Sequence, residues 1–246
     1  MMNETIETML NHKSIRKFEK GHTIPEATIT AILEAGQSAA TSHFIQAYSI
    51  IRVKDRSKVE GIAELSQNLH IKDASAFFVF CADMKRLEYA SRKHHLAFDY
   101  DSLENTIATI VDVALVAQNV MTAAESLGYG GCYIGGVRNA PFEISEKLEL
   151  PDKVLPIFGL TLGVPVEGQE VKPRLPLSAI VHEDRYDETK YDDLLQQYDE
   201  VINEYYAKRT SNKKDATWTK PIASFFSAKK RVHMRDFFEK KGFTLK

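Results

Sequence analysis

Residues 101–128 read DSLENTIATIVDVALVAQNVMTAAESLG, and this stretch constrains the fold more than any other. Asp101 and Glu104 form a capping box, which is typical of a helix N-terminus, and Gly128 closes the helix. The apolar residues between them fall on nearly every face of the predicted helix: Ile107, Ile110, Val111, Val113, Ala114, Leu115, Val116, Ala117, Val120, Met121 and Ala124. Such a helix must be covered on most sides, which one domain can do and a dimer interface would do more completely.

Four apolar runs lie on either side of this helix and are predicted as strands, at 47–53, 75–82, 129–135 and 154–163. The second, SAFFVFCA, is continuously apolar, as expected of a strand buried on both faces. Other helices are predicted at 5–12, 26–36, 55–65, 85–95, 192–208 and 223–241. Residues 165–184 contain several prolines without periodicity and are expected to be a loop or arm. Alternating strands and helices indicate an α/β or α+β layered domain, followed by an extension without strands.

The composition is typical of a globular chain, with 43% hydrophobic and 27% charged residues over 246 positions. No run approaches the roughly 18 consecutive apolar residues of a membrane span. Residues 1–7 are polar and do not resemble a secretory signal, so we expect a cytoplasmic protein without a membrane partner. The two cysteines, Cys81 and Cys132, lie in apolar runs, which excludes a disulfide framework and predicts buried free thiols.

The net charge of −2 conceals an asymmetry, because residues 208–246 carry 12 Lys and Arg against 3 Asp and Glu. A basic segment on an acidic body is compatible with an anionic ligand and equally with a solvated or self-docking tail. The segment has no nucleic-acid-binding motif, so no nucleic-acid partner is expected. No spacing typical of metal ligands occurs either, and no metal is expected.

Two constellations could hold a flat, anionic ligand. HKSIR at 12–16 places an imidazole, two cations and a hydroxyl within five residues, which suits a phosphate, although a charged helix end has the same composition. GGCYIGG at 130–136 has four glycines, which let the backbone approach a ligand closely. It matches neither a Walker A loop nor the dinucleotide fingerprint, and a strand between two tight turns gives the same pattern.

Two basic segments follow later in the chain. KPR at 172–174 fixes a proline between two cations, so both could face one anion, and a solvated turn is the alternative. RTSNKK at 209–214, with Trp218 close behind, would suit a nucleotide phosphate, and an exposed loop between two helices is the alternative.

In this order the segments resemble the nitroreductase family, in its oxygen-insensitive NADPH-dependent nitro and flavin reductase branch. The resemblance covers nearly the whole chain, and ordered agreement is more specific than any single motif. It runs through HKSIRKF at 12–18, QSAATSHFIQ at 37–46, FVFCAD at 78–83, GCYIGGVR at 131–138, KPRLP at 172–176 and RTSN at 209–212 with Thr217 and Trp218.

The resemblance implies an α+β fold with helices flanking a mixed sheet, and a domain-entwined homodimer that binds FMN at each subunit interface. It implies an FMN-binding core over residues 1–190 and a helical, basic extension over 191–246, packed on the core or on the partner subunit. The helix from Leu103 to Leu127 would form the dimer core. Aspartate at Val113 or Val116 is therefore expected to disrupt both the dimer and FMN binding.

The resemblance also assigns cofactor-binding positions in the first half of the chain. The N-terminal set is His12, Lys13, Ser14 and Arg16. The family usually has Arg where Lys13 stands, a change that keeps a phosphate contact but not a bidentate one. A serine-rich stretch contributes Thr41 and Ser42. A family glutamine near the flavin pyrimidine ring corresponds to Asn68 or to its neighbour Gln67. Backbone contacts would come from Tyr133, Ile134, Gly135 and Gly136.

Three further cofactor-binding positions lie in the basic segments. Lys172 would face the N1 and O2 edge of the flavin, where negative charge accumulates on reduction, and Arg174 would bind the FMN phosphate. Arg209 would select NADPH over NADH by contacting its 2′-phosphate.

The implied function is an FMN-dependent NADPH oxidoreductase that reduces nitroaromatics, quinones or free flavin in two-electron, ping-pong turnover. Its partner would be a small-molecule electron acceptor. No side chain is clearly required as a catalytic acid or base. Three alternatives stay open: a flavin reductase that releases reduced FMN to a partner monooxygenase, a thiol-linked reductase that uses Cys132, and a flavin-binding module without turnover.

Overall fold

The computed structural model describes residues 3–166, 170–209 and 216–244. The chain divides into two compact units. The core unit comprises Met1–Gln169 with Arg231–Lys246, and the arm unit comprises Glu170–Lys230.

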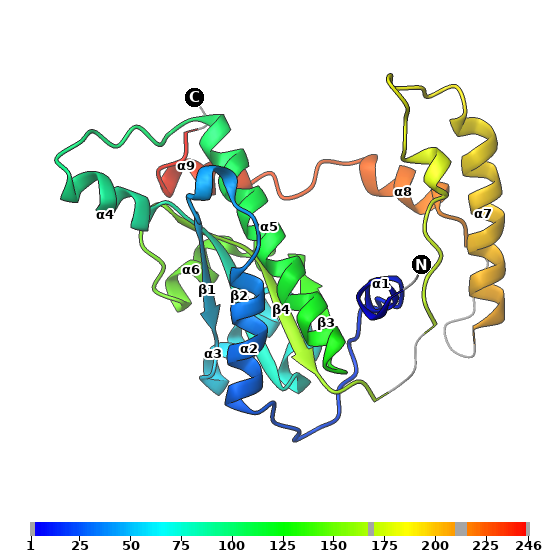
Figure 1. Cartoon of the computed structure of the whole chain (residues 1–246), viewed down its shortest axis with the longest axis horizontal. Helices are drawn as coiled ribbons and strands as arrows, with labels where there is room; N and C mark the ends of the chain where they lie inside the picture. Colours follow the sequence, from blue (N-terminus) through cyan, green and yellow to red (C-terminus); the bar gives the residue numbers. More distant parts are fainter. Residues whose placement is uncertain (1–2, 167–169, 210–215, 245–246) are drawn as a thin grey trace. The chain divides into compact units, whose positions relative to one another are not determined.

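The core unit contains one four-stranded sheet (Figure 1). Its strands are β1 (Tyr48–Arg52), β2 (Ala76–Asp83), β3 (Gly130–Ile134) and β4 (Val154–Gly163), in the order β1-β2-β4-β3. All three strand pairings are antiparallel, and within the described residues the parallel pairing is the isolated bridge between Ser14 and Gly131. The α+β class is therefore confirmed, and the mixed character expected of the sheet is limited to that bridge.

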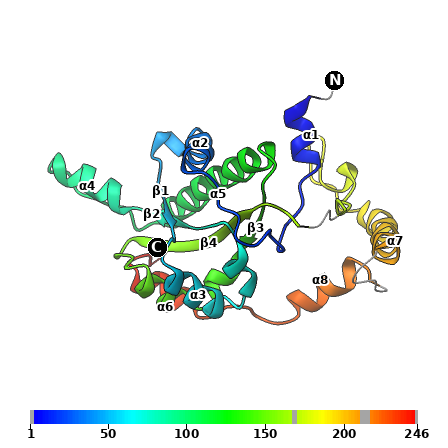
Figure 2. The same cartoon turned by 90° about the horizontal axis from the view of Figure 1, so that it is seen from below.

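Helices cover both faces of the sheet. The side chains of β2 alternate, so Phe78 and Phe80 enter one buried cluster while Phe77 and Val79 enter the other. Figure 2 shows α2 (Glu26–Gln37) and α5 (Leu103–Ser126) on one side, and α3 (Arg56–Leu65) and α6 (Pro141–Lys147) on the other. The strand β2 is buried at every position, as its continuous apolar run predicts.

Helix α5 divides its apolar residues between two faces. Val113, Val116 and Val120 are fully buried in the core. A second row stays exposed at intervals of four residues, namely Leu103, Ile107, Val111 and Leu115, with exposed fractions of 43–52%. The helix is long and apolar enough to cross a membrane, but half of its most apolar window is buried within the chain, as in a core helix. The apolar residues predicted on nearly every face of this helix therefore belong to one face buried in the core and one row exposed on the surface.

The ends of α5 differ in detail from the sequence prediction. The N-cap is Ser102, whose hydroxyl accepts from the Asn105 amide, whereas Asp101 accepts from the Thr244 amide at 2.7 Å. Gly128 has a left-handed φ of 83°, which agrees with its predicted role as the stop.

The remaining helical segments of the core unit are shorter. They are α1 (Glu4–Leu10), η1 (Ser42–Phe44), η2 (Leu69–Asp73), α4 (Lys85–Lys93), η3 (Gly135–Asn139) and α9 (Met234–Lys240). Helix α9 belongs to the core because Phe237 and Phe243 are fully buried there and Lys241 Nζ donates to the Leu150 carbonyl at 2.7 Å.

The arm unit consists of η4 (Leu177–Ala179), α7 (Tyr191–Lys208) and α8 (Thr219–Phe226). The hydroxyl of Tyr198 on α7 donates to the Pro173 carbonyl at 2.8 Å, which fastens the proline-rich segment to this helix. Asp199 accepts from the amides of Trp218 and Thr219 and so fixes the start of α8.

Two sequence predictions differ from the structure in the C-terminal part. The single helix expected at 223–241 is wrong, because α8 and α9 are separate helices that pack in different units. The compact units also divide the chain elsewhere than between residues 190 and 191, since residues 170–190 pack with α7 and residues 231–244 return to the core. Packing of an extension on a partner subunit stays a prediction.

Candidate functional site

The N-terminal cationic segment lies along β3. Ile15 donates its amide to the Gly131 carbonyl at 2.8 Å, and Ser14 forms the parallel bridge to the same glycine. This pairing places Arg16 next to the Cys132 thiol, where its charge opposes the burial that raises the pKa of the thiol. The segment thus brings a cation to the glycine-rich strand, and the assignment of Arg16 to a flavin site stays a prediction.

The neighbours of this segment have different environments. His12 Nδ1 lies 2.7 Å from Glu125 Oε1 on α5, so this ring nitrogen already has a carboxylate as its hydrogen-bond partner. Lys13 lines an open pocket with Glu4, Glu7 and other residues. His70 on η2, which sequence reasoning missed, has its pKa lowered by burial and by the charge of Arg16.

The four glycines of residues 130–136 serve two purposes. A Cβ on Gly131 would lie 2.6 Å from the Thr161 carbonyl oxygen, so the sheet itself requires this glycine. The nearest atom to a Cβ on Gly135 would be 3.5 Å away, and this residue borders a cavity of about 320 Å³ lined by Ala114, Gln118, Tyr133, Gly135, Arg138 and Phe158. The backbone at Gly135 is therefore open to a ligand.

The two residues before Gly135 are committed to the interior. Tyr133 donates its hydroxyl to the Ala117 carbonyl at 2.8 Å, and burial raises the pKa of this phenol. Ile134 is 1% exposed. A contact from either residue to a flat ligand would therefore use the backbone or the ring face of Tyr133.

The loop that carries Thr41 and Ser42 is held by a buried acid on α5. Asp112, which is fully buried, accepts from the Ser42 amide at 2.9 Å and from the Ala47 amide at 3.1 Å. Within the described residues the buried Thr41 hydroxyl has no hydrogen-bond partner. Sequence reasoning missed Asp112, although an acid within an apolar helix is a recognisable signal.

Helix α3 ends in a Schellman motif that carries Gln67 and Asn68. The Asn68 amide donates to the Ala63 carbonyl at 2.9 Å, and the Gln67 amide donates to the Glu64 carbonyl at 3.0 Å. Gln67 has a φ of 58° at the position that glycine usually fills, at a cost of about 1–2 kcal/mol. Asn68 Nδ2 contacts Gly136, because a Cβ on that glycine would lie 2.2 Å away. The structure thus brings Asn68, and not the exposed Gln67 side chain, to the glycine segment.

The arm unit brings two of the predicted cations together. Lys172 Nζ lies 5.4 Å from the ring centre of Tyr206, and Arg209 Cζ lies 5.9 Å from the same ring centre. Arg209 also faces Tyr205 at 5.6 Å. Stacking on these rings gives both cations a shared platform. Ser211, Asn212, Lys213 and Lys214, which were expected to follow Arg209 in the nucleotide site, lie outside the described residues.

Arg174 has a different neighbour in the arm unit. Its charge partly opposes the burial that raises the pKa of Tyr198, whose hydroxyl bonds to Pro173. Arg174 therefore lies near the point where Tyr198 anchors the proline-rich segment, two positions after Lys172.

Taken within each unit, these residues fit a flat ligand with polar edges and a phosphate. The core unit offers an open glycine backbone at Gly135, a buried hydroxyl on Thr41 that lacks a partner, and the cation Arg16. The arm unit offers three further cations. FMN has the matching chemistry, with an aromatic ring system, a carbonyl-bearing edge and a phosphate.

Cys132 is placed among these residues, but its thiol is not activated. It is 3% exposed, and burial raises its pKa even though Arg16 acts in the opposite direction. A thiol with a raised pKa stays protonated at neutral pH and is a poor nucleophile.

We therefore expect Cys132→Ala to retain acceptor-dependent NADPH oxidation within about twofold, because only packing changes. Steady-state rates of the wild-type protein and the variant, each with saturating FMN, measure this. A loss greater than tenfold in a variant with an unchanged unfolding midpoint would restore a thiol-dependent mechanism.

Comparisons with known proteins cover the whole chain. The model described as "Nitroreductase family" matches residues 9–164, and that described as "Nitroreductase family, C-terminal domain" matches residues 172–246. The chain is 47% identical to a "CR(VI) reductase" of Pseudomonas sp. (strain G-1), over 98% of this chain and 99% of the relative. It is 40% identical to an "FMN reductase (NADPH)" of Bacillus subtilis (strain 168), over the same shares. The solved structure of Bacillus megaterium NfrA1 superposes with a TM-score of 0.95 and 43% identity, over 98% of this chain and 100% of that one.

Proposed function

Because this chain belongs to the nitroreductase family, we propose that it is an FMN-dependent NADPH oxidoreductase that reduces nitroaromatics, quinones or free flavin. Its relatives named as an NADPH-dependent FMN reductase and a Cr(VI) reductase support an oxidoreductase of this kind. The structural observation that carries the proposal is the pairing of a cation with an open backbone at one strand. Arg16 lies beside Cys132 of β3, whose thiol its charge affects, and Gly135 follows the same strand directly.

In this proposal the protein positions FMN and neutralises its negative charge. Bound FMN supplies the two-electron transfer between NADPH and the acceptor. Arg16, Lys13 and Arg174 provide positive charge for the phosphate and the polar edge of the ring. Thr41 offers its buried hydroxyl as a hydrogen-bonding group. Lys172 contributes charge beside the pyrimidine edge, which is preorganised electrostatic stabilisation.

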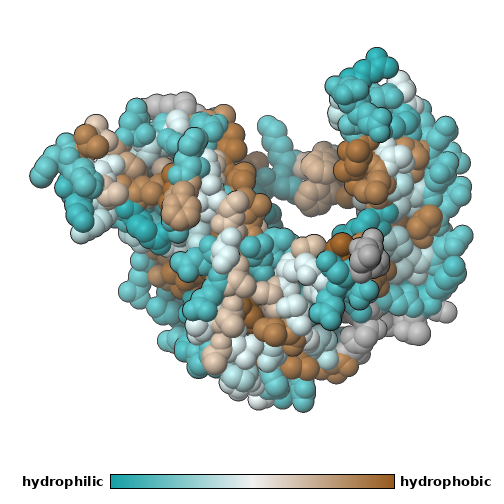
Figure 3. Space-filling view, in the orientation of Figure 1, coloured by the Kyte–Doolittle hydropathy of each residue, from teal (hydrophilic) through white to brown (hydrophobic). Residues whose placement is uncertain are grey.

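The proposal includes a homodimer with FMN at the subunit interface. The exposed row Leu103, Ile107, Val111 and Leu115 supports it, because contiguous exposed apolar residues mark interaction surfaces. In Figure 3, apolar side chains, in brown, gather over the part of the core unit where α5 runs. A cytoplasmic location, without a membrane or nucleic-acid partner, is part of the same proposal.

Steady-state kinetics test this function. Under anaerobic conditions, purified protein loaded with FMN should oxidise NADPH over many turnovers only when a quinone or a nitroaromatic is present, and double-reciprocal plots at several acceptor concentrations should be parallel, as in ping-pong turnover. Loss of the bound flavin during gel filtration would favour the alternative, a reductase that releases reduced FMN. If FMN-loaded protein does not oxidise NADPH in the presence of an acceptor, the protein is a flavin-binding module without turnover.

Arg209 is proposed to recognise the 2′-phosphate of NADPH. Arg209→Ala should raise the KM for NADPH by about 10–100-fold, which corresponds to roughly 1.4–2.8 kcal/mol, and leave NADH turnover and FMN content unchanged. The matched control is Lys208→Ala, since Lys208 pairs with Glu204 on the surface of α7. Equal effects on both nucleotides would assign Arg209 to stability and not to selectivity.

A further inference from the structure

The carbonyl of Ser66 joins two segments of the proposed flavin site. Ser66 is fully buried at the C-terminal end of α3, where helix carbonyls lack partners within the helix. Its carbonyl accepts from Asn68 Nδ2 at 2.6 Å and from Asn139 Nδ2 at 3.1 Å. The backbone of Gly136 lies against the same oxygen, since a Cβ there would be 2.2 Å from it. The turn at 66–68 and the glycine segment therefore meet at one carbonyl.

The side chain of Asn139 is fixed at both of its polar atoms. Its Oδ1 accepts from Arg231 Nε at 2.9 Å, so the amide cannot turn over without losing both bonds. Arg231 is the first residue of the chain that returns from the arm unit to the core. Two residues later, His233 Nε2 lies 3.0 Å from the carbonyl of Arg138. The returning chain thus holds η3 at two adjacent residues.

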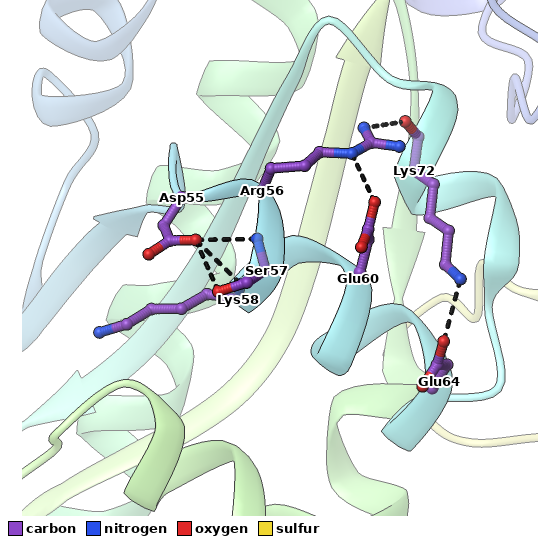
Figure 4. Close-up of polar contacts among 7 residues, drawn as sticks. All are labelled: Asp55, Arg56, Ser57, Lys58, Glu60, Glu64 and Lys72. Carbon is purple, nitrogen blue, oxygen red and sulfur yellow. Dashed lines mark hydrogen bonds and ion pairs between the residues drawn. The ribbon is translucent and has the colours of Figure 1, made fainter.

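A hydrogen bond and an ion pair hold η2, which follows this turn, against α3 (Figure 4). Arg56 Nη1 donates to the Lys72 carbonyl at 2.7 Å, and Lys72 Nζ lies 3.1 Å from Glu64 Oε1. These contacts tie η2 to α3. They do not reach η3, which the bond from Asn139 Nδ2 to the Ser66 carbonyl links to the turn, beside the packing of Gly136 against the same carbonyl.

We propose that Asn139 is a positioning residue that aligns the Gln67–Asn68 turn with the Gly135–Gly136 backbone, and that Arg231 acts through Asn139. This inference rests on the proposed function, because these two segments are among those of the core unit that would contact FMN. Asn139 itself bonds to the protein at both polar atoms and is not assigned a contact with the cofactor. The consequence is that FMN affinity depends on a residue outside the set of flavin contacts.

Three variants and a control test the inference: Asn139→Ala, Arg231→Ala, the double variant, and Asn105→Ala. The control loses a comparable bond, because Asn105 Nδ2 donates to the Tyr100 carbonyl at 3.1 Å elsewhere in the core unit. The dissociation constant of FMN is measured on apoprotein through quenching of flavin fluorescence. The visible circular dichroism of the bound flavin reports its orientation, and urea unfolding of each apoprotein reports stability.

Asn139→Ala should weaken FMN binding about tenfold, the scale of one buried hydrogen bond, and alter the dichroism of the bound flavin. Arg231→Ala should weaken binding about threefold. The double variant should be no weaker than Asn139→Ala, because residues that act through one contact are not additive. Asn105→Ala should bind FMN as the wild type does, whatever its stability.

Wild-type affinity and dichroism in Asn139→Ala would overturn the inference while leaving the proposed function intact. Additive losses in the double variant would overturn the part assigned to Arg231. If Asn139→Ala does not fold, Arg231→Ala carries the test, and unchanged FMN binding in that variant contradicts the proposal. Failure of the wild-type apoprotein to bind FMN would overturn the proposed function, and the inference with it.

Discussion

Aspartate at Val111 and Leu115 together should convert the protein into a folded monomer that no longer retains FMN. Both side chains are nearly half exposed on the outer row of α5, so the isolated chain tolerates a charge there. In a dimer that buries this row, an unpaired carboxylate costs several kcal/mol per site. Sedimentation velocity gives the mass, and the visible spectrum after gel filtration gives the FMN content.

Two comparison variants make this result specific. Leu96→Asp places the same charge on an exposed leucine away from α5 and should remain a dimer with FMN. Val116→Asp should unfold the protein, because Val116 is fully buried against the core of its own chain. For the same reason neither Val113 nor Val116 can report on the dimer alone. A dimeric, flavin-containing Val111→Asp and Leu115→Asp protein would show that α5 is not the interface.

Removal of the buried carboxylate at Asp112 should destabilise the protein by roughly 2–5 kcal/mol. Asp112→Ala leaves the amides of Ser42 and Ala47 without acceptors, and each unsatisfied buried donor costs about 1–3 kcal/mol. FMN binding should fall as well, since the loop with Thr41 would lose its anchor. The free energy of unfolding in urea and the FMN dissociation constant are the two measurements.

Asp112→Asn provides an intermediate case, because an amide keeps one acceptor oxygen and should cost about half as much. Asp55→Ala is the matched control. Asp55 also accepts from two backbone amides, but it does so at the exposed N-terminus of α3, where loss of a cap costs about 1 kcal/mol. Equal effects of Asp112→Ala and Asp55→Ala would remove the special role assigned to the buried acid.

The strands and the long helix could be predicted from sequence because their buried positions form continuous or closely spaced runs of apolar residues. The predicted strand at 154–163 coincides with β4, and the other three differ from the observed ends by one residue. The helix predicted at 223–241 failed because the chain leaves the arm unit between α8 and α9, so that Phe237 is buried in the core whereas Phe226 on α8 is exposed. Helix α6 went unrecognised, being only 7 residues long.

The residues of the candidate site likewise fall into those that could be predicted from sequence and those that could not. Its cations and glycines could be named from motifs, because each motif is a continuous stretch of chain. Asn139 and His70 could not, because their roles depend on partners far away in sequence, as Asn139 and Arg231 are separated by 92 positions. The glycines have different causes, since packing alone requires Gly131, whereas a Cβ on Gly135 would make only an ordinary contact with Arg138.

The visible spectrum of the purified protein, followed during anaerobic addition of NADPH, tests the central claim most directly. The account predicts a yellow protein with about one FMN per chain, whose absorbance bleaches on addition of NADPH and returns when a quinone is admitted. NADH should bleach it more slowly. A colourless protein that takes up no added FMN, or a bound flavin that NADPH fails to bleach, would contradict the account.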